Sequence, residues 1–151
     1  MGAVAEGNVQ VLDLSMIREL RVSEADVEEA AAEAWKELRD REQLYRDSRP
    51  ALEPPKKTVI LVDDGIATGC SILAAIAAMR RRRAARVVVA VPVAPAAGFS
   101  AIRMEADEFV SVAEPELFLA VSQWYENFNQ ISDEDLQRLL GKAVASTPRA
   151  A

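Results

Sequence analysis

The hydrophobic positions in the N-terminal part of the chain follow two different spacings. Val9-Gln10-Val11-Leu12 is a short alternating run directly after Gly7-Asn8, which predicts a strand that follows a turn. From residue 24 to about residue 47, apolar residues instead recur every three or four positions, which predicts one long helix. Ser23 is its expected N-cap, with Asp26 three residues on. The residues expected on the buried face of this helix are Val27, Ala31, Ala34, Leu38 and Tyr45.

The pattern changes after Arg49-Pro50, which is predicted to end the long helix, and after a linker at Pro54-Pro55 and Lys56-Lys57. Thr58–Val62 is a continuous apolar and β-branched run, as expected for a strand that is covered on both faces. An alanine-rich helix is predicted over 71–83, a buried strand over 87–93, a short helix over 99–106 and a third strand over 109–112. This β-α-β-α-β order predicts an α/β fold, with a parallel sheet, flanking helices and right-handed crossovers.

The C-terminal part carries an aromatic stretch and a final helix. Residues 118–128 contain Trp124, Tyr125 and Phe128, which we interpret as packing on the core in preference to stacking on a ligand ring. The last helix is predicted from Ser132, with Asp135 at its third position. The length of 151 residues fits a single domain. Within it we expect an N-terminal strand, long helix and linker at 1–57, a β-α-β-α-β core at 58–113 and a helical tail at 114–151.

Composition excludes several classes of chemistry. The chain has no histidine, so Ser-His-Asp, Cys-His and His-ligated zinc sites are impossible. The net charge of −6 argues against nucleic-acid binding, and Arg80-Arg81-Arg82-Arg83 is interpreted as a solvated helix end that complements the helix dipole. The single cysteine, Cys70, fits a reducing cytoplasm. No apolar run is long enough to cross a bilayer and the start has no basic segment, so we expect neither a signal peptide nor a membrane partner.

The candidate site is residues 59–71, of sequence Val-Ile-Leu-Val-Asp-Asp-Gly-Ile-Ala-Thr-Gly-Cys-Ser. Asp63 and Asp64 come directly after a predicted strand, at the sheet edge where open α/β sheets bind ligands. Adjacent carboxylates repel each other unless something donates to both, such as vicinal hydroxyls or a hydrated divalent metal. Gly65 and Gly69 bracket a tight loop that opens a helix, whose first amides are donors to an anion. The pattern therefore predicts a ribose-phosphate site.

A turn with a helix cap is the structural alternative for an isolated Asp-Asp-Gly. The order of strand, acidic pair, glycine-bracketed loop, hydroxyl residues and helix favours the binding site. The predicted binding residues are Asp63, Asp64, Gly65, Ile66, Ala67, Thr68, Gly69, Cys70 and Ser71. Cys70 is interpreted as a small residue of the loop and not as a nucleophile.

This run resembles the phosphoribosyl pyrophosphate (PRPP) signature of type I phosphoribosyltransferases, and is similar to a bacterial group of predicted phosphoribosyltransferases. The resemblance extends over nearly the whole chain. It continues in residues 1–7, Tyr45-Arg46, Arg49-Pro50, Val91-Pro92-Val93-Ala94-Pro95, and Gln123-Trp124-Tyr125 with Phe128 and Gln130.

The resemblance implies an enzyme of nucleotide metabolism that transfers a phosphoribosyl group to an unidentified acceptor, with PRPP or a nucleoside 5′-monophosphate as ligand. Asp63 and Asp64 would hold the ribose 2′ and 3′ hydroxyls, and residues 65–71 would cradle the 5-phosphate. Mg²⁺ is the implied cofactor, held mainly by PRPP on its pyrophosphate side near the acidic pair and not directly by protein. No catalytic residue is implied.

Two departures from the family pattern matter. Purine-salvage members carry an acidic residue at the position of Ala67, so purine salvage is not supported. The family also has an earlier strand and an Arg-Gly-Gly type pyrophosphate turn, and no such turn precedes Val59. The chain thus resembles a member without its N-terminal part. A parallel sheet cut at one side exposes unpaired strand groups, so a homo-oligomer is expected.

Two other classes of protein compete with this interpretation. Receiver domains also have a strand that ends in Asp-Asp, but they need a later strand that ends in aspartate and another that ends in lysine. Here the later strands end at Val93-Ala94 and Val112-Ala113, so the receiver interpretation fails. A regulator or decayed fragment that binds PRPP or a nucleotide without catalysis remains open.

Overall fold

The protein is described by a computed structural model that covers residues 1–46 and 54–145. The predicted end of the long helix, at Asp47 and Arg49-Pro50, lies outside the described residues. No helix in the described ranges has the length and apolar character needed to cross a membrane.

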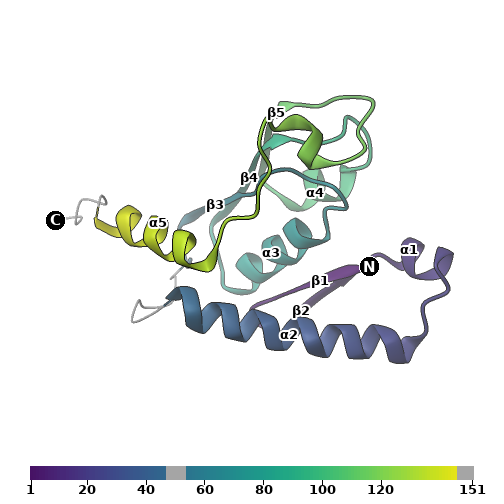
Figure 1. Ribbon diagram of the computed structural model, residues 1–151. Coiled ribbons are helices and arrows are strands. Elements are labelled where there is room, and N and C mark those ends of the chain that lie inside the picture. The colour runs from purple at the N-terminus through teal and green to yellow at the C-terminus, as the bar shows by residue number, and fades with distance from the viewer. Residues whose placement is uncertain (47–53, 146–151) are drawn as a thin grey trace.

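A parallel sheet forms the centre of the fold (Figure 1). It contains β3 (Thr58–Val62), β4 (Arg86–Val93) and β5 (Glu108–Ala113), with β4 in the middle. Val62 pairs with Ala90, and Ala90 with Val110. The helices that connect the strands are α3 (Cys70–Arg81) and α4 (Ser100–Glu105). The predicted α/β order is confirmed, with element ends that differ from the predicted ones by one or two residues.

One face of the sheet packs against α3 and α4. Val87, Val89, Val91 and Val93 of β4 all point to this face and are buried. Val87, Val89 and Val91 share one core cluster with Ile72 and Ile76 of α3 and Ile102 of α4. Alternate residues of β4 therefore supply the sheet side of the main core.

The other face of the sheet is open, which contradicts the prediction that Thr58–Val62 is covered on both faces. Val62 is 75% exposed, and Val112 of β5 is 88% exposed. Ile60 and Val110 on the same face are exposed as well. A continuous apolar run shows that both sides of a strand are apolar, but it carries no information about which neighbouring element covers each side.

An antiparallel hairpin lies on the far side of α3 from the sheet (Figure 1). It pairs β1 (Gly2–Ala5) with β2 (Val9–Leu12). Gly7 and Asn8 both adopt positive φ, at 78° and 56°, which confirms the predicted turn and the strand after it. Val9 packs with Ala74 and Ala78 of α3 in a second core cluster. The alanines let the hairpin approach the helix closely.

Two elements of the N-terminal part were not predicted. The first is β1, which the alternating run of its partner did not reveal. The second is α1 (Leu14–Glu19), whose N-cap Asp13 accepts a hydrogen bond from the Met16 N–H at 2.9 Å.

The long helix α2 (Glu24–Arg46) packs against the hairpin on the side away from α3 (Figure 1). The five residues predicted for its buried face are all half-buried. Ser23 caps it as predicted, because its Oγ accepts a hydrogen bond from the Asp26 N–H at 3.2 Å and donates to the Asp26 carboxylate at 2.7 Å. The fold is therefore layered in the order sheet, α3, hairpin and α2.

The arginine run at the end of α3 joins these layers, which corrects its interpretation as a merely solvated helix end. The Arg81 guanidinium donates to the carbonyls of Gly7 and Asn8 at 2.6 and 2.9 Å. Arg82 forms an ion pair with Glu6. These contacts fasten the hairpin turn to the C-terminal end of α3.

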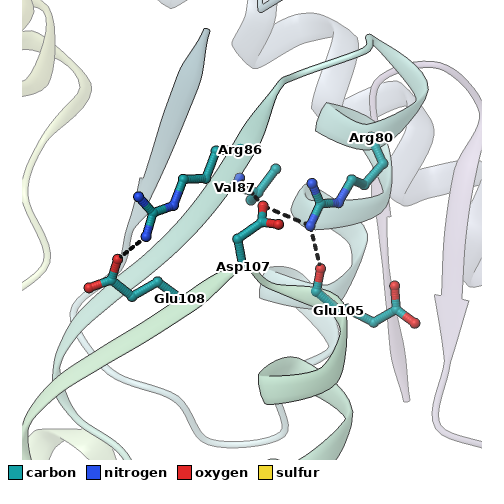
Figure 2. A network of polar contacts seen from close by, with 6 residues as sticks. All are labelled: Arg80, Arg86, Val87, Glu105, Asp107 and Glu108. Carbon is teal, nitrogen blue, oxygen red and sulfur yellow. Dashed lines mark hydrogen bonds and ion pairs between the residues drawn. The ribbon is translucent and has the colours of Figure 1, made fainter. Parts of the chain in front are cut away.

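A polar network lies where β4 and β5 begin, as Figure 2 shows. The Asp107 carboxylate accepts a hydrogen bond from the Val87 N–H at 2.6 Å and pairs with Arg80 at 2.9 Å. Arg80 also donates to the Glu105 carbonyl at 2.9 Å. The two bonds that Asp107 accepts, from the N–H group and from the guanidinium, lower the pKa of its carboxyl below the ordinary value.

The C-terminal segment contains the 3-10 turn η1 (Val121–Trp124) and then α5 (Asp133–Ala145). Ser132 caps α5 as predicted, and the Ser132 Oγ accepts from the Asp135 N–H at 3.2 Å. The interpretation of the aromatic residues as packed on the core is wrong for two of them, because Trp124 is 45% exposed and Phe128 is 46% exposed. Tyr125 is half-buried.

Candidate functional site

The acidic pair emerges where β3 ends at Val62. Asp63 is half-buried and Asp64 is exposed. The Asp64 N–H donates a hydrogen bond to Asp63 Oδ1 at 3.0 Å, which fixes the Asp63 carboxylate across the turn. Both side chains therefore start from one sheet edge, and Asp64 is open to an incoming ligand.

The environment disfavours the charge on Asp63. Partial burial is the main cause that raises the pKa of the Asp63 carboxyl, and the neighbouring Asp64 carboxylate raises it further. The hydrogen bond from the Asp64 N–H acts in the opposite direction but does not cancel the effect. A ligand that donates to both carboxylates would relieve this repulsion.

The loop after the acidic pair is anchored at Gly65 and Ile66. The Ile66 N–H donates to the Val93 carbonyl at 3.0 Å, and the Ile66 side chain is buried. A Cβ added at Gly65 would lie 2.7 Å from the Val121 side chain and 3.0 Å from that of Val93. Glycine at 65 therefore lets the end of β4 and the η1 segment pack directly against the turn.

Gly69 sets the direction in which α3 leaves the loop. It occupies the N-cap position with φ of 77°, a left-handed conformation that favours glycine. A Cβ there would also lie 2.9 Å from Ile102 Cδ1. The first amides of a helix have no partner inside it and lie at the positive end of its dipole, so the start of α3 suits an anion.

The structure places the nine predicted residues around this single turn. Asp64, Ala67, Thr68 and Ser71 are exposed, and so are available to a ligand. Gly65, Ile66, Gly69 and Cys70 are buried and shape the loop from within. Cys70 is a free, buried thiol in the first turn of α3.

An aromatic residue from the C-terminal segment reaches the same turn. The Tyr125 hydroxyl donates to the Asp64 carbonyl at 2.6 Å, across 61 positions of sequence. The Tyr125 and Phe128 rings lie 5.2 Å apart between centroids, tilted at 53°. Tyr125 therefore fixes an aromatic pair beside the acidic residues.

An open cavity of about 710 Å³ lies between this pair and the acidic turn. It is lined by Asp64, Tyr125, Asn127, Phe128, Asn129, Gln130 and Ile131. The sequence interpretation did not single out Asn127 or Asn129, because isolated amides in a segment without periodicity carry no recognisable signal.

Comparison with known proteins identifies the family. A family described as "Phosphoribosyl transferase domain" matches residues 4–127, which include the acidic turn, α3 and Tyr125. The chain belongs to this family.

Relatives of this phosphoribosyl transferase domain support the assignment. Two proteins of Mycobacterium tuberculosis, from strains CDC 1551 and H37Rv, each named "putative phosphoribosyl transferase", are 35% identical over 142 residues, 94% of this chain. A crystal structure of a protein from Thermus thermophilus has a TM-score of 0.71 and 36% identity over 92% of this chain. The chain spans about a third (32%) of the length of the Mycobacterium relatives and 65% of the Thermus chain.

The phosphoribosyl transferase match confirms the family resemblance and the fold predicted from sequence. For a metal, the described residues contain no group of three or more His, Cys, Asp or Glu side chains that could hold an ion. The carboxylates of Asp63 and Asp64 directly precede the loop, and carboxylate oxygens are ligands that a hydrated divalent cation accepts.

Proposed function

We propose that this chain binds PRPP, or a nucleoside 5′-monophosphate, at residues 63–71 and transfers its phosphoribosyl group to a nitrogen acceptor. The observation that carries the proposal is the single turn that joins an acidic pair at the end of β3 to the glycine-capped start of α3. Carboxylates and helix amides at one turn match the two ends of a ribose 5-phosphate. The family assignment supports the same ligand class.

Each part of the turn has a separate role in this proposal. Asp63 and Asp64 accept hydrogen bonds from the 2′ and 3′ hydroxyls, which lowers the repulsion between the carboxylates. The Thr68 and Ser71 hydroxyls and the first amides of α3 donate to the 5-phosphate. Gly65 and Gly69 keep the backbone close enough for those amides to reach it.

In the reaction, the acceptor nitrogen forms a bond to C1 of the ribose while the bond between C1 and the pyrophosphate oxygen breaks. Pyrophosphate leaves with the electron pair, and the acceptor nitrogen loses its proton to solvent. Mg²⁺, when bound with PRPP, neutralises charge that builds up on the pyrophosphate. The residues of this chain contribute by holding the sugar and its phosphate in position.

A second candidate is a PRPP or nucleotide binder without turnover. Residues 1–151 contain no Arg-Gly-Gly turn that would supply donors to the pyrophosphate, and binding of the sugar and 5-phosphate at residues 63–71 does not require one. Loss of one such preorganised donor costs about two to three decades in rate. A compartment such as the cytoplasm, where thiols stay reduced, fits both candidates because Cys70 is free.

Calorimetry with ribose 5-phosphate, PRPP and AMP in the presence of Mg²⁺ tests the proposal. We expect Asp64→Asn to weaken binding about tenfold or more, since a charge-assisted hydrogen bond is lost. Asp40→Asn, on the exposed face of α2, is the matched control and should bind as the unaltered chain does. If Asp63→Asn and Asp64→Asn both bind these ligands as tightly as the unaltered chain does, the site assignment is wrong.

Release of pyrophosphate from PRPP separates the two candidates. Mg²⁺-dependent release by the 151-residue chain that is lost in Asp64→Asn identifies a transferase. Tight PRPP binding without release identifies the binder.

A further inference from the structure

We propose that two neighbouring turns at the start of the parallel sheet bind a small oligophosphate anion, apart from the site at residues 63–71. One turn leads into β3 and contains Lys56 and Lys57, and the other joins α3 to β4 and contains Arg83. We call these two segments the paired turns. They lie at the beginning of β3, whereas the acidic pair follows the end of the same strand.

Backbone hydrogen bonds connect the paired turns. The Lys56 N–H donates to the Arg83 carbonyl at 3.3 Å. The Lys57 carbonyl accepts from the Ala85 N–H at 2.9 Å. The two lysines therefore lie beside Arg83, although β3 and α3 separate them along the chain.

The charges of the paired turns are not neutralised by the rest of the described chain. All three cationic side chains are exposed, and none of them forms an ion pair or a side-chain hydrogen bond with another described residue. The neighbouring arginines differ, because Arg80 pairs with Asp107 at 2.9 Å and Arg86 pairs with Glu108 at 2.5 Å (Figure 2). In a chain of net charge −6, this group of three is a local surplus of positive charge.

The backbone at two of these cations adopts a conformation that favours glycine. Arg83 has a φ of 60° and Lys56 a φ of 63°. Arg83 follows the C-cap of α3, where glycine is common and where a cation complements the helix dipole. Lys56 precedes a strand and gains nothing from that dipole. Residues in strained conformations gather at functional sites, so two neighbouring cations in this conformation point to a common ligand.

Three positive charges on two turns favour a ligand with several anionic groups. Guanidinium and ammonium groups both bind phosphate oxygens, whereas a single carboxylate is too small to pair with all three cations. A long polyanion would extend past the paired turns over a protein whose net charge is negative. The ligand class is therefore a short chain of phosphates, either free or attached to a nucleoside.

Calorimetry with inorganic triphosphate and the 151-residue chain tests the proposal, without Mg²⁺ and with excess ribose 5-phosphate to occupy residues 63–71. We expect triphosphate to bind, with an affinity that falls as salt is added. Lys56→Gln combined with Arg83→Gln should weaken binding about tenfold, since two contacts to the anion are lost. Absence of binding, or binding that ribose 5-phosphate abolishes, would overturn the proposal.

Arg21→Gln combined with Lys36→Gln is the matched control. It removes the same charge from two exposed positions outside the paired turns, and Arg21 has a similar backbone conformation, with φ of 53°. This variant should bind triphosphate as the unaltered chain does. If both double variants lose affinity equally, binding depends on net charge alone and the paired turns are not the site.

ATP and single-stranded oligothymidylate, measured in the same way, identify the source of the phosphates. ATP that binds more tightly than triphosphate identifies a nucleotide, and ATP that binds more weakly identifies a free phosphate chain. Oligothymidylate that binds more tightly than both contradicts a compact ligand, because the surface would then suit a nucleic-acid backbone.

Arg83→Gly separates a binding role from a structural one. Glycine adopts a positive φ without strain, so this variant should melt at a higher temperature than the unaltered chain while it binds triphosphate about threefold more weakly. Arg21→Gly should also raise the melting temperature but leave triphosphate binding unchanged. If Arg83→Gly binds triphosphate as tightly as the unaltered chain does, the Arg83 side chain does not contact the ligand and the proposal is wrong.

Discussion

The Asp63 carboxylate is proposed to bind the ribose, but in its ionised form it destabilises the folded chain. The destabilisation depends on pH. The pKa of Asp63 is raised in the folded chain, so the folded state holds the proton more tightly than the unfolded state. The free energy of unfolding therefore falls as pH rises from the ordinary aspartate pKa of 3.8 through the raised pKa of Asp63, and the destabilisation persists above it. We expect Asp63→Asn to raise the melting temperature at pH 7 while weakening ribose 5-phosphate binding about tenfold.

The same thermal scans repeated well below pH 3.8 provide the check, because Asp63 is then protonated in both states and the advantage of asparagine should vanish. A melting temperature of Asp63→Asn below that of the unaltered chain at pH 7 would contradict the burial argument.

Gly69 is the residue whose conformation we expect to matter most in the loop. Alanine there would adopt a φ of 77° and meet Ile102 Cδ1 at 2.9 Å. The left-handed conformation alone costs a non-glycine residue about 1–2 kcal/mol, so Gly69→Ala should lower the free energy of unfolding by at least that amount. Gly141→Ala in α5 meets nothing within 4 Å and should be neutral or stabilising by about 0.5–1 kcal/mol. Urea denaturation measures the free energy of unfolding of both variants. Equal values would contradict the argument that the conformation at position 69 requires glycine.

At the scale of elements, the Asp107 network joins α3, β4 and β5 at the sheet edge opposite the loop (Figure 2). Asp107→Ala should lower the melting temperature, because it leaves the Val87 N–H without its acceptor and removes the ion pair with Arg80. Since the pKa of Asp107 is lowered, this stabilisation is complete above the ordinary value of 3.8 and is lost as pH falls through the lowered value.

Glu108→Gln is the control for this network. It removes an exposed ion pair with Arg86, in which both side chains are about half exposed, and exposed pairs contribute little. Differential scanning calorimetry should therefore show a clear loss for Asp107→Ala and almost none for Glu108→Gln. Similar losses would mean that the N–H bond to Asp107 contributes no more than a surface pair.

Helices and strands could be predicted from sequence where the residues that determine them lie close together along the chain. Ser23 with Asp26, and Ser132 with Asp135, are capping patterns within three residues, and both form the expected bonds. The bond from Tyr125 to the Asp64 carbonyl spans 61 positions, and no local spacing predicts it. The exposure of Val62 is likewise a property of its neighbours and not of its own strand. The sequence therefore predicted the acidic turn, but not that the Tyr125 and Phe128 rings lie beside it.

At the scale of the whole molecule, the open sheet face predicts self-association. Ile60, Val62, Val110 and Val112 lie on one face of adjacent strands and are exposed, and large apolar patches favour association. We expect a mass that rises with concentration in light scattering, and a smaller rise for Val112→Lys. Leu20→Lys, at an exposed apolar residue beside α1, is the control and should leave the association unchanged. A concentration-independent monomer would contradict the prediction.

Helix α3 is covered by the sheet on one side and by the hairpin on the other, and this double cover has a consequence for amide hydrogen exchange. An amide inside α3 can exchange only when both layers separate from it, whereas an amide of α2 or α5 needs the loss of fewer contacts. The slowest-exchanging protons of the molecule should therefore belong to α3. The loop at 65–69 leads into the first turn of α3, and the arginines that bind the hairpin turn lie at the last turn of α3. The helix expected to exchange most slowly therefore connects the candidate ligand loop to the hairpin.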